Sequence, residues 1–299
     1  MLRFVFRTVG VLIVLQLSVI VVVRATFANG GTGVLSYRDI DSVSEQRGIY
    51  LYDIDRDLHH YLLPFTAPFL TYTWTATGDS ILFVQQEDAE GYRLYEYDIV
   101  AATRRDLPRI WEGPVSLNMA PDGENLAVIG TGFVEIVRWQ EPDLPSQVLL
   151  DATDTVNIAI SADWSTDGRK LLIATRPDAE SFFRVVELDI ATGTQTDLFA
   201  TTKLSNPGVQ YLSQDEIVYE SAASRTNDVM SHNLLTDTTR QIVHNIGTPG
   251  YFVLSDDHET LLVIDLTFAD RSLTLMDLDT GETRSLTESA LYAVQWVPR

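Results

Sequence analysis

One short acidic stretch contains the residue types most often used to bind metal ions. It reads DIDRD over residues 53–57, with His59 and His60 close behind, and its alternating carboxylates resemble the start of a calcium-binding loop. Such a loop has glycine at its sixth position and glutamate at its twelfth, where this chain has Leu58 and Pro64. We therefore expect Asp53 to serve a hairpin, and keep a calcium site as the less favoured alternative.

A second stretch, DDHE at residues 256–259, combines carboxylates with an imidazole, as acid–base or metal chemistry requires. It aligns with the turns PDGE at 121–124 and TDGR at 166–169, so we expect a solvated hairpin tip. The chain has no Gly-x-Ser-x-Gly nucleophile elbow, which argues against a serine peptidase. Neither stretch predicts a catalytic or metal-binding residue.

A repeated unit of about 45 residues positions both stretches. Its marker is a bulky residue that ends a short strand before a polar turn and an apolar strand. The markers are Trp74, Met119, Trp164, Tyr211 and Leu254, separated by 45, 45, 47 and 43 residues. A second marker, an acidic or amide residue after a later strand, keeps the same period at Asp53, Asp98, Asp189, Asn233 and Asp277. Two independent markers with one period predict a β-propeller.

Each complete unit reads as four antiparallel strands, for example 159–164, 170–175, 182–189 and 195–199. The first unit begins at Val34 with what corresponds to a second strand, and the chain ends on LYAVQWVPR, which carries a marker at Trp296 but no later strands. We therefore predict an all-β, six-bladed propeller over residues 34–299, in which the C-terminal segment forms the inner strand of blade 1.

Ligands of propellers commonly meet the ring at its axis, where the first strands converge. The residue before each marker is therefore a candidate for lining the channel. These candidates are Thr73, Asn118, Asp163, Gln210, Val253 and Gln295. They include only one carboxylate. A catalytic site at the axis would be expected to bring several acidic residues together, so this set argues against an enzyme. We expect the marker aromatics to be core residues that pack between blades, with a set of sugar-stacking rings as the alternative. Trp111 and Trp139 fall outside the register of the markers and are candidates for an exposed contact with a partner.

The N-terminal segment, residues 1–24, contains an apolar run from Thr8 to Val23 flanked by Arg3, Arg7 and Arg24. We expect a hydrophobic helix that is either an uncleaved signal anchor with a cytoplasmic N-terminus or a cleaved signal peptide. Residues 25–33 form a glycine-rich linker. The first alternative predicts a single-pass membrane protein with its propeller outside, and the second a secreted or periplasmic protein.

Charge and cysteine content restrict the partners. The formal net charge is −21 at pH 7, so we expect no nucleic-acid partner and no membrane contact beyond the N-terminal helix. The absence of cysteine excludes disulfides, thiolate metal sites and cysteine nucleophiles. We expect a monomeric ring with a protein or peptide partner and no cofactor other than calcium.

The turn motifs resemble those of one family, the TolB-like β-propellers. The residues that carry the resemblance are WSTDGRKLLIA (164–174), APDGENLAVI (120–129), LDIATGTQT (188–196) and MDLDTGETR (276–284). It extends over residues 34–299, with departures in the third unit, FVEIVRWQEPDLPSQ, and in the fifth, which lacks Asp-Gly. The resemblance implies a six-bladed ring of the kind found in periplasmic proteins that bind peptides at the channel, and in non-catalytic caps of prolyl-oligopeptidase-type peptidases.

From these features we expect a non-catalytic binding scaffold at the bacterial cell envelope. The alternative, from a different class, is a propeller hydrolase or lyase with a divalent cation at the ring axis.

Overall fold

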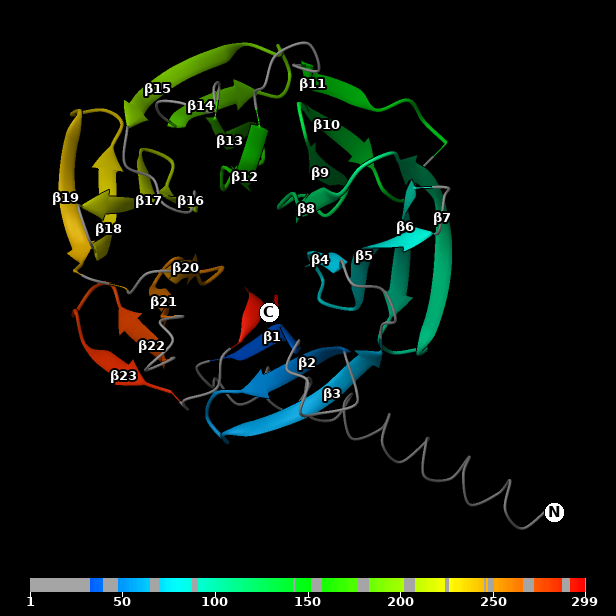
Figure 1. Ribbon diagram of the computed structural model, residues 1–299, viewed down its shortest axis with the longest axis horizontal. Helices are drawn as coiled ribbons and strands as arrows, with labels where there is room; N and C mark the ends of the chain where they lie inside the picture. Colours follow the sequence, from blue (N-terminus) through cyan, green and yellow to red (C-terminus); the bar gives the residue numbers. More distant parts are fainter. Residues whose placement is uncertain are drawn as a thin grey trace.

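The computed structural model contains six four-stranded antiparallel sheets, the blades, arranged around one axis (Figure 1). The structure describes residues 33–39, 48–64, 70–87, 91–141, 143–151, 158–176, 183–201, 208–223, 226–244, 246, 250–265, 272–286 and 291–298. The predicted N-terminal helix, residues 1–24, lies outside these residues, as does the predicted linker, residues 25–33, except for Gly33. Within the described ranges, no element is a helix of the length and apolarity needed to cross a membrane.

The blades follow one another along the chain, and the first-named strand of each lies nearest the axis. Blade 1 contains β24 (Tyr292–Trp296), β1 (Val34–Asp39), β2 (Gly48–Asp53) and β3 (Leu58–Pro64). Blade 2 contains β4 (Leu70–Trp74), β5 (Ser80–Glu87), β6 (Gly91–Asp98) and β7 (Thr103–Trp111). Blade 3 contains β8 (Val115–Met119), β9 (Asn125–Gly130), β10 (Phe133–Arg138) and β11 (Gln147–Asp151).

The other three blades repeat this order. Blade 4 contains β12 (Ile158–Trp164), β13 (Lys170–Arg176), β14 (Phe183–Asp189) and β15 (Gln195–Thr201). Blade 5 contains β16 (Val209–Ser213), β17 (Glu216–Ala223), β18 (Thr226–Asn233) and β19 (Thr238–Val243). Blade 6 contains β20 (Gly250–Leu254), β21 (Thr260–Asp265), β22 (Ser272–Asp277) and β23 (Thr283–Ser285). The predicted six-bladed, four-stranded architecture is confirmed.

The ring closes in blade 1, where the two ends of the chain pair. In Figure 1 the red strand β24 lies beside the blue strand β1. Trp296 is opposite Leu35, as Trp164 is opposite Leu171 in blade 4, and the Val297 amide donates to the Val34 carbonyl at 2.9 Å. The predicted closure by the C-terminal strand is therefore correct, and Trp296 occupies the marker position of its blade.

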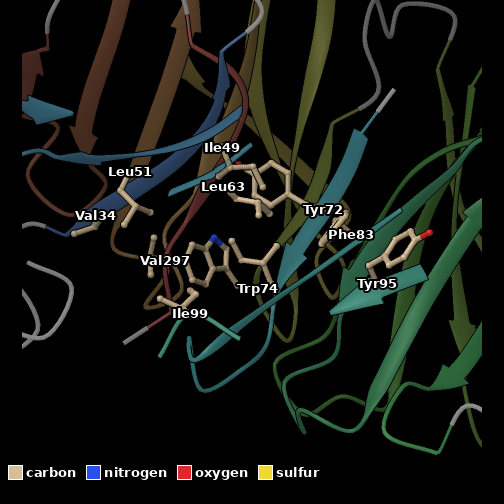
Figure 2. Close-up of a cluster of buried hydrophobic side chains, with 11 residues drawn as sticks. Val34, Ile49, Leu51, Leu63, Tyr72, Trp74, Phe83, Tyr95, Ile99 and Val297 are labelled. Atoms are coloured by element: carbon tan, nitrogen blue, oxygen red, sulfur yellow. The ribbon is translucent and has the colours of Figure 1, made fainter. Parts of the chain in front are cut away.

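The hydrophobic core is divided into six clusters, one between each pair of adjacent blades. Figure 2 shows the cluster between blades 1 and 2, where Val34 and Leu51 pack with Trp74, Tyr72 and the C-terminal Val297. Since each blade has a neighbour on both faces, a second strand can be apolar without alternation, as in Ile-Leu-Phe-Val at residues 81–84.

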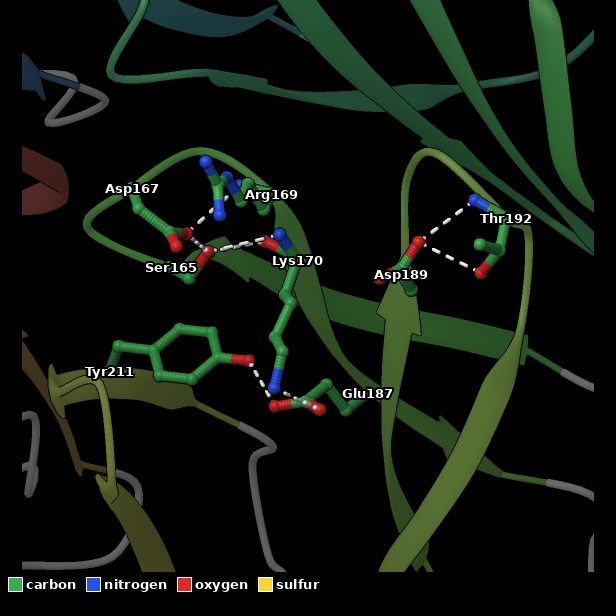
Figure 3. Close-up of polar contacts among 8 residues, drawn as sticks. All are labelled: Ser165, Asp167, Arg169, Lys170, Glu187, Asp189, Thr192 and Tyr211. Carbon is green, nitrogen blue, oxygen red and sulfur yellow. Dashed lines mark hydrogen bonds and ion pairs between the residues drawn. The ribbon is translucent and has the colours of Figure 1, made fainter.

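The hairpin between the third and fourth strands depends on the second marker of the repeat. The Asp53 carboxylate accepts hydrogen bonds from the Arg56 amide at 3.0 Å and from its guanidinium at 2.7 Å. In blade 4 the Asp189 carboxylate accepts from the Thr192 amide and hydroxyl, both at 2.8 Å (Figure 3). The hairpin role expected for Asp53 is confirmed, because short polar side chains close such turns on their own backbone.

Candidate functional site

A cavity of about 540 Å³ lies at the axis, on the face of the ring where the innermost strands end. The inner strands β4, β8, β12, β16, β20 and β24 supply its wall, and the hairpins that follow them supply its rim. The C-terminus also reaches this rim, at Pro298. The volume lies within the ~300–1,000 Å³ typical of small-ligand and side-chain pockets.

All six channel-lining residues predicted from the repeat line this cavity. They are Thr73, Asn118, Asp163, Gln210, Val253 and Gln295. Their equivalence follows from the registers, in which the residue after each of them lies opposite the second strand of its own blade. The repeat therefore identified the positions around the axis.

Three of these side chains are amides that tie adjacent blades together. The Asn118 amide donates to the Ala162 carbonyl at 2.6 Å, which joins blades 3 and 4. The Gln295 amide donates to the Tyr72 carbonyl at 2.6 Å, which joins blades 1 and 2. The Gln210 side-chain oxygen accepts from the Leu254 amide at 2.9 Å, which joins blades 5 and 6. The sequence did not predict this structural role, since it depends on how neighbouring blades are staggered.

Asp163 makes the corresponding tie between blades 4 and 5, with a carboxylate. Its Oδ2 accepts a hydrogen bond from the Tyr211 amide at 2.8 Å. Burial raises the pKa of Asp163 to about 6, although the Tyr211 amide, His258 and the Asn118 amide all favour the charged form. The desolvation cost of this carboxylate is thus larger than the stabilisation that its neighbours provide.

The junction of blades 4 and 5 has a second polar connection farther from the axis. Figure 3 shows the Tyr211 hydroxyl and the Lys170 ammonium converging on the Glu187 carboxylate, at 3.0 and 2.8 Å. Burial, followed by the Glu187 charge, raises the pKa of Tyr211. Tyr211 is therefore held at both its backbone and its hydroxyl, which positions the Asp163 side of the cavity.

The acidic hairpin at residues 255–259 contributes to the cavity rim. Asp256 and His258 both line the cavity, and His258 Nδ1 lies 2.8 Å from the Leu212 carbonyl of blade 5. The predicted hairpin is present, with Asp257 accepting from the Ser255 hydroxyl at 2.5 Å. The prediction of a solvated hairpin tip is incomplete, because two side chains of this hairpin, Asp256 and His258, line the axial cavity.

The expectation that Trp111 or Trp139 forms an exposed contact is wrong. The side chains are 8% and 5% exposed, and both belong to the core between blades 2 and 3. The Trp111 indole donates to Glu135 of blade 3 at 2.5 Å, and the Trp139 indole donates to the Gly123 carbonyl at 2.9 Å. Both indoles are therefore part of the junction between blades 2 and 3.

The marker aromatics are also core residues. Trp74, Trp164, Tyr211 and Trp296 are at most 8% exposed, as expected for wedges between blades. Two of their indoles donate to the preceding blade, Trp74 to Ser36 at 2.7 Å and Trp164 to the Asn118 carbonyl at 3.1 Å. Their rings border the cavity but have little free surface on which a sugar could stack.

The side chains around the axis lack the donors that a metal ion needs. Among the described residues, no three His, Asp or Glu side chains are positioned to share one ion. The cavity lining contributes Asp163, Asp256 and His258, and His258 already faces the Leu212 carbonyl. In the first acidic stretch, His59 stacks on Tyr52 and bonds to Tyr37 at 2.8 Å. These residues do not fit a divalent-cation site.

Known structures share this fold at low sequence identity. TolB from Acinetobacter baumannii superposes with a TM-score of 0.72 and 15% identity, covering 92% of this chain and 70% of that one. A chain in the nidogen/laminin complex gives a TM-score of 0.64 and 10% identity, covering 89% and 98%. Oligogalacturonate lyase in complex with manganese superposes with a TM-score of 0.56 and 15% identity, covering 86% of this chain and 74% of that one.

No protein-family model and no curated protein sequence matches the chain. The structural likeness confirms the resemblance to TolB-type propellers at the level of fold. The function must be argued from the cavity.

Proposed function

We propose that the chain is a non-catalytic scaffold that binds a segment of a protein or peptide partner in the axial cavity. The observation that supports this most is the cavity itself, a concave site on one face of the ring, lined by all six inner strands. Its wall contains polar groups already engaged in ties between blades, which keeps the site preformed. A preformed concave site binds a partner at low entropic cost.

We propose further that the propeller is exported and tethered to the cell membrane by the segment at residues 1–24. The support is the apolar run between Thr8 and Val23 with Arg3 and Arg7 before it. If the segment is cleaved, the propeller is instead secreted or periplasmic. Sequencing the N-terminus of the mature protein from membrane fractions distinguishes the two: Met1 or Leu2 supports the anchor, and a start near Asn29 contradicts it.

Blocking the cavity mouth tests the binding function. The full-length chain, tagged at its N-terminus because the C-terminus lies at the rim, is immobilised and used to capture proteins from envelope extract. Thr166 is an exposed rim residue, so Thr166→Trp should cover the mouth without disturbing the core. Ala191→Trp places the same indole on an exposed outer hairpin of the same blade and is the matched control.

We expect a partner captured by the wild-type and Ala191→Trp proteins to be lost with Thr166→Trp. Equal capture by all three proteins would show that the partner binds elsewhere on the ring, and would contradict the proposal.

The alternative, a cation-dependent lyase or hydrolase, has one observation in its favour: the fold it shares with oligogalacturonate lyase in complex with manganese. The donor set of the cavity argues against it. Thermal unfolding with calcium, magnesium, manganese or EDTA tests this alternative. We expect no shift in Tm, and a rise of several degrees with one ion that EDTA reverses would favour the enzyme.

A further inference from the structure

The four ties around the axis are not chemically equivalent. Asn118, Gln210 and Gln295 make theirs with neutral amides, whereas Asp163 uses a carboxylate. The Asp163 carboxylate accepts from the Tyr211 amide, as the side-chain oxygen of Gln210 accepts the Leu254 amide. The Asn118 amide and the Trp164 backbone also favour its charged form. The bond to the next blade, taken by itself, therefore does not require a charge at position 163.

The charge at this position is also unfavourable for the folded chain alone. Burial raises the pKa of Asp163 to about 6, so ionisation in the cavity is costly at neutral pH. Ionisable groups in such surroundings are concentrated at functional sites. A cation entering the cavity would offset this cost, whereas a neutral group would not.

Among the described lining residues no Lys or Arg supplies that cation, although the His258 imidazole, when protonated, favours the charged form of Asp163. Among the described residues that line the cavity, the charged or titratable side chains are Asp163, Asp256, His258 and Tyr211, without any Lys or Arg. Tyr211 directs its hydroxyl to Glu187. The wall thus presents two carboxylates and one imidazole to a ligand in the cavity.

The rim extends this negative field to the surface. Five of the hairpins that follow the inner strands carry an exposed aspartate, namely Asp79, Asp122, Asp167, Asp215 and Asp256. Among the described residues of these hairpins, Arg169 is the one Lys or Arg. Several of the carboxylates close their own turns, as Asp122 does by accepting from the Asn125 amide at 2.9 Å, but their charge still acts over distance. Of these five aspartates Asp256 lines the cavity, and the others lie on the neighbouring hairpins. Like charges near a concave mouth attract counter-ions and speed their association.

We propose that the axial cavity recognises a cationic side chain of the partner segment, a guanidinium or an ammonium, which pairs with Asp163. This inference rests on the proposed binding function and names its chemistry. A cavity of about 540 Å³ has room for such a side chain together with adjoining backbone.

The test uses short peptides that differ in charge alone. Acetyl-Gly-Arg-Gly-amide is titrated into the full-length chain and its affinity measured by calorimetry. The same peptide with citrulline in place of arginine is the neutral probe of nearly equal shape. We expect the arginine peptide to bind about tenfold more tightly than the citrulline peptide, the loss expected for one partly solvated charge pair.

The variant Asp163→Asn removes the charge and retains an acceptor for the Tyr211 amide. It should lower the affinity for the arginine peptide about tenfold and leave that for the citrulline peptide unchanged. Asp279→Asn, at an exposed residue of the outer hairpin of blade 6, removes one charge far from the axis and should change neither. Thermal unfolding of both variants verifies that they are folded.

Equal affinities for the two peptides, no binding of the arginine peptide, or full arginine binding by Asp163→Asn would each overturn the assignment. These failures are distinguishable from failure of the proposed function. The binding proposal would still hold if Thr166→Trp abolished partner capture while charge had no effect on peptide affinity.

Discussion

Blades 1 and 4 have the same inner geometry but are assembled and charged differently. In both, an indole marker lies opposite the second strand, and the residue before it ties the next blade. Blade 4 is built from consecutive strands and uses Asp163, whereas blade 1 recruits β24 from the far end of the chain and uses Gln295. The comparison indicates that closure in blade 1 relies on non-covalent pairing alone, and that the tie itself needs no charge.

Removing the closing strand should have the largest effect. Deletion of residues 291–299 takes away Leu291, Val294, Trp296 and Val297, all buried, and leaves β1 as an unpaired edge. At about 1.5–3 kcal/mol for each buried side chain, the loss approaches the ~5–15 kcal/mol stability of a typical domain. We expect aggregation or a far lower Tm in differential scanning calorimetry.

A synthetic peptide of residues 291–299, added in trans, should partly restore that Tm. A deletion variant that remained soluble and equally stable would contradict both the closure and the count of six blades.

Truncation of the markers compares the two blades residue by residue. Trp164→Ala and Trp296→Ala should each lower the free energy of unfolding by about 3–5 kcal/mol in urea titrations, because each leaves a cavity between blades. The phenylalanine variants separate packing from hydrogen bonding. Trp164 donates to the Asn118 carbonyl, whereas Trp296 Nε1 has no partner among the described residues.

Trp164→Phe should therefore lower the free energy of unfolding by about 1 kcal/mol more than Trp296→Phe does. Equal losses would mean that the indole bond to blade 3 contributes nothing.

Introducing charge at the blade 1 tie should be costly. Gln295→Glu replaces the amide that donates to the Tyr72 carbonyl with a carboxylate that cannot donate. Two acceptors would then face each other in the cavity wall, and we expect a loss of about 1–3 kcal/mol at pH 7.5. The loss should decrease in acid, where a protonated glutamate can donate again. A pH-independent loss in urea titrations would contradict this explanation.

Removing the charge of Asp163, which ties blade 4 to blade 5, should stabilise the protein, by less than Gln295→Glu destabilises it. The pKa of Asp163 in the folded state, about 6, exceeds the ~3.9 of an unfolded chain, so the folded state binds its proton more readily. The stability associated with this proton is fully present below pH ~3.9 and is lost as the pH rises through 6. The stability of Asp163→Asn relative to the wild type should therefore increase between pH ~3.9 and 6.

Above pH 6 we expect Asp163→Asn to be about 1–2 kcal/mol more stable than the wild type, the partial exposure of the side chain reducing the full linkage value. Urea titrations of both proteins at pH 4.5 and 7.5 measure the difference. A difference that is the same at both pH values would show that ionisation of Asp163 carries no cost.

The sequence was sufficient to predict the fold and the residues that line the axial cavity. Trp74, Trp164 and Trp296 recur at one place in the unit, and the apolar second strands recur with them, so the period specified six blades and their closure. The residues before the markers line the cavity because every inner strand has the same orientation toward the axis.

What the sequence could not predict depends on contacts between units. The ties made by Asn118 and Asp163 reach the next blade, at a stagger that no single repeat encodes. His258 Nδ1 lies 2.8 Å from the Leu212 carbonyl of blade 5, a contact between units that the repeat pattern does not contain. Trp111 was predicted to be exposed because it falls outside the register of the repeat, but its indole donates to Glu135 of the neighbouring blade.

Partner capture by a cavity that lacks the Asp163 charge tests the central claim most directly. Wild-type, Asp163→Asn and Asp279→Asn proteins are immobilised at equal density, and the partner retained from envelope extract at pH 7.5 is quantified by mass spectrometry. We predict that Asp163→Asn, although the more stable protein, loses the partner that the other two retain. Equal retention by all three would contradict the role assigned to Asp163.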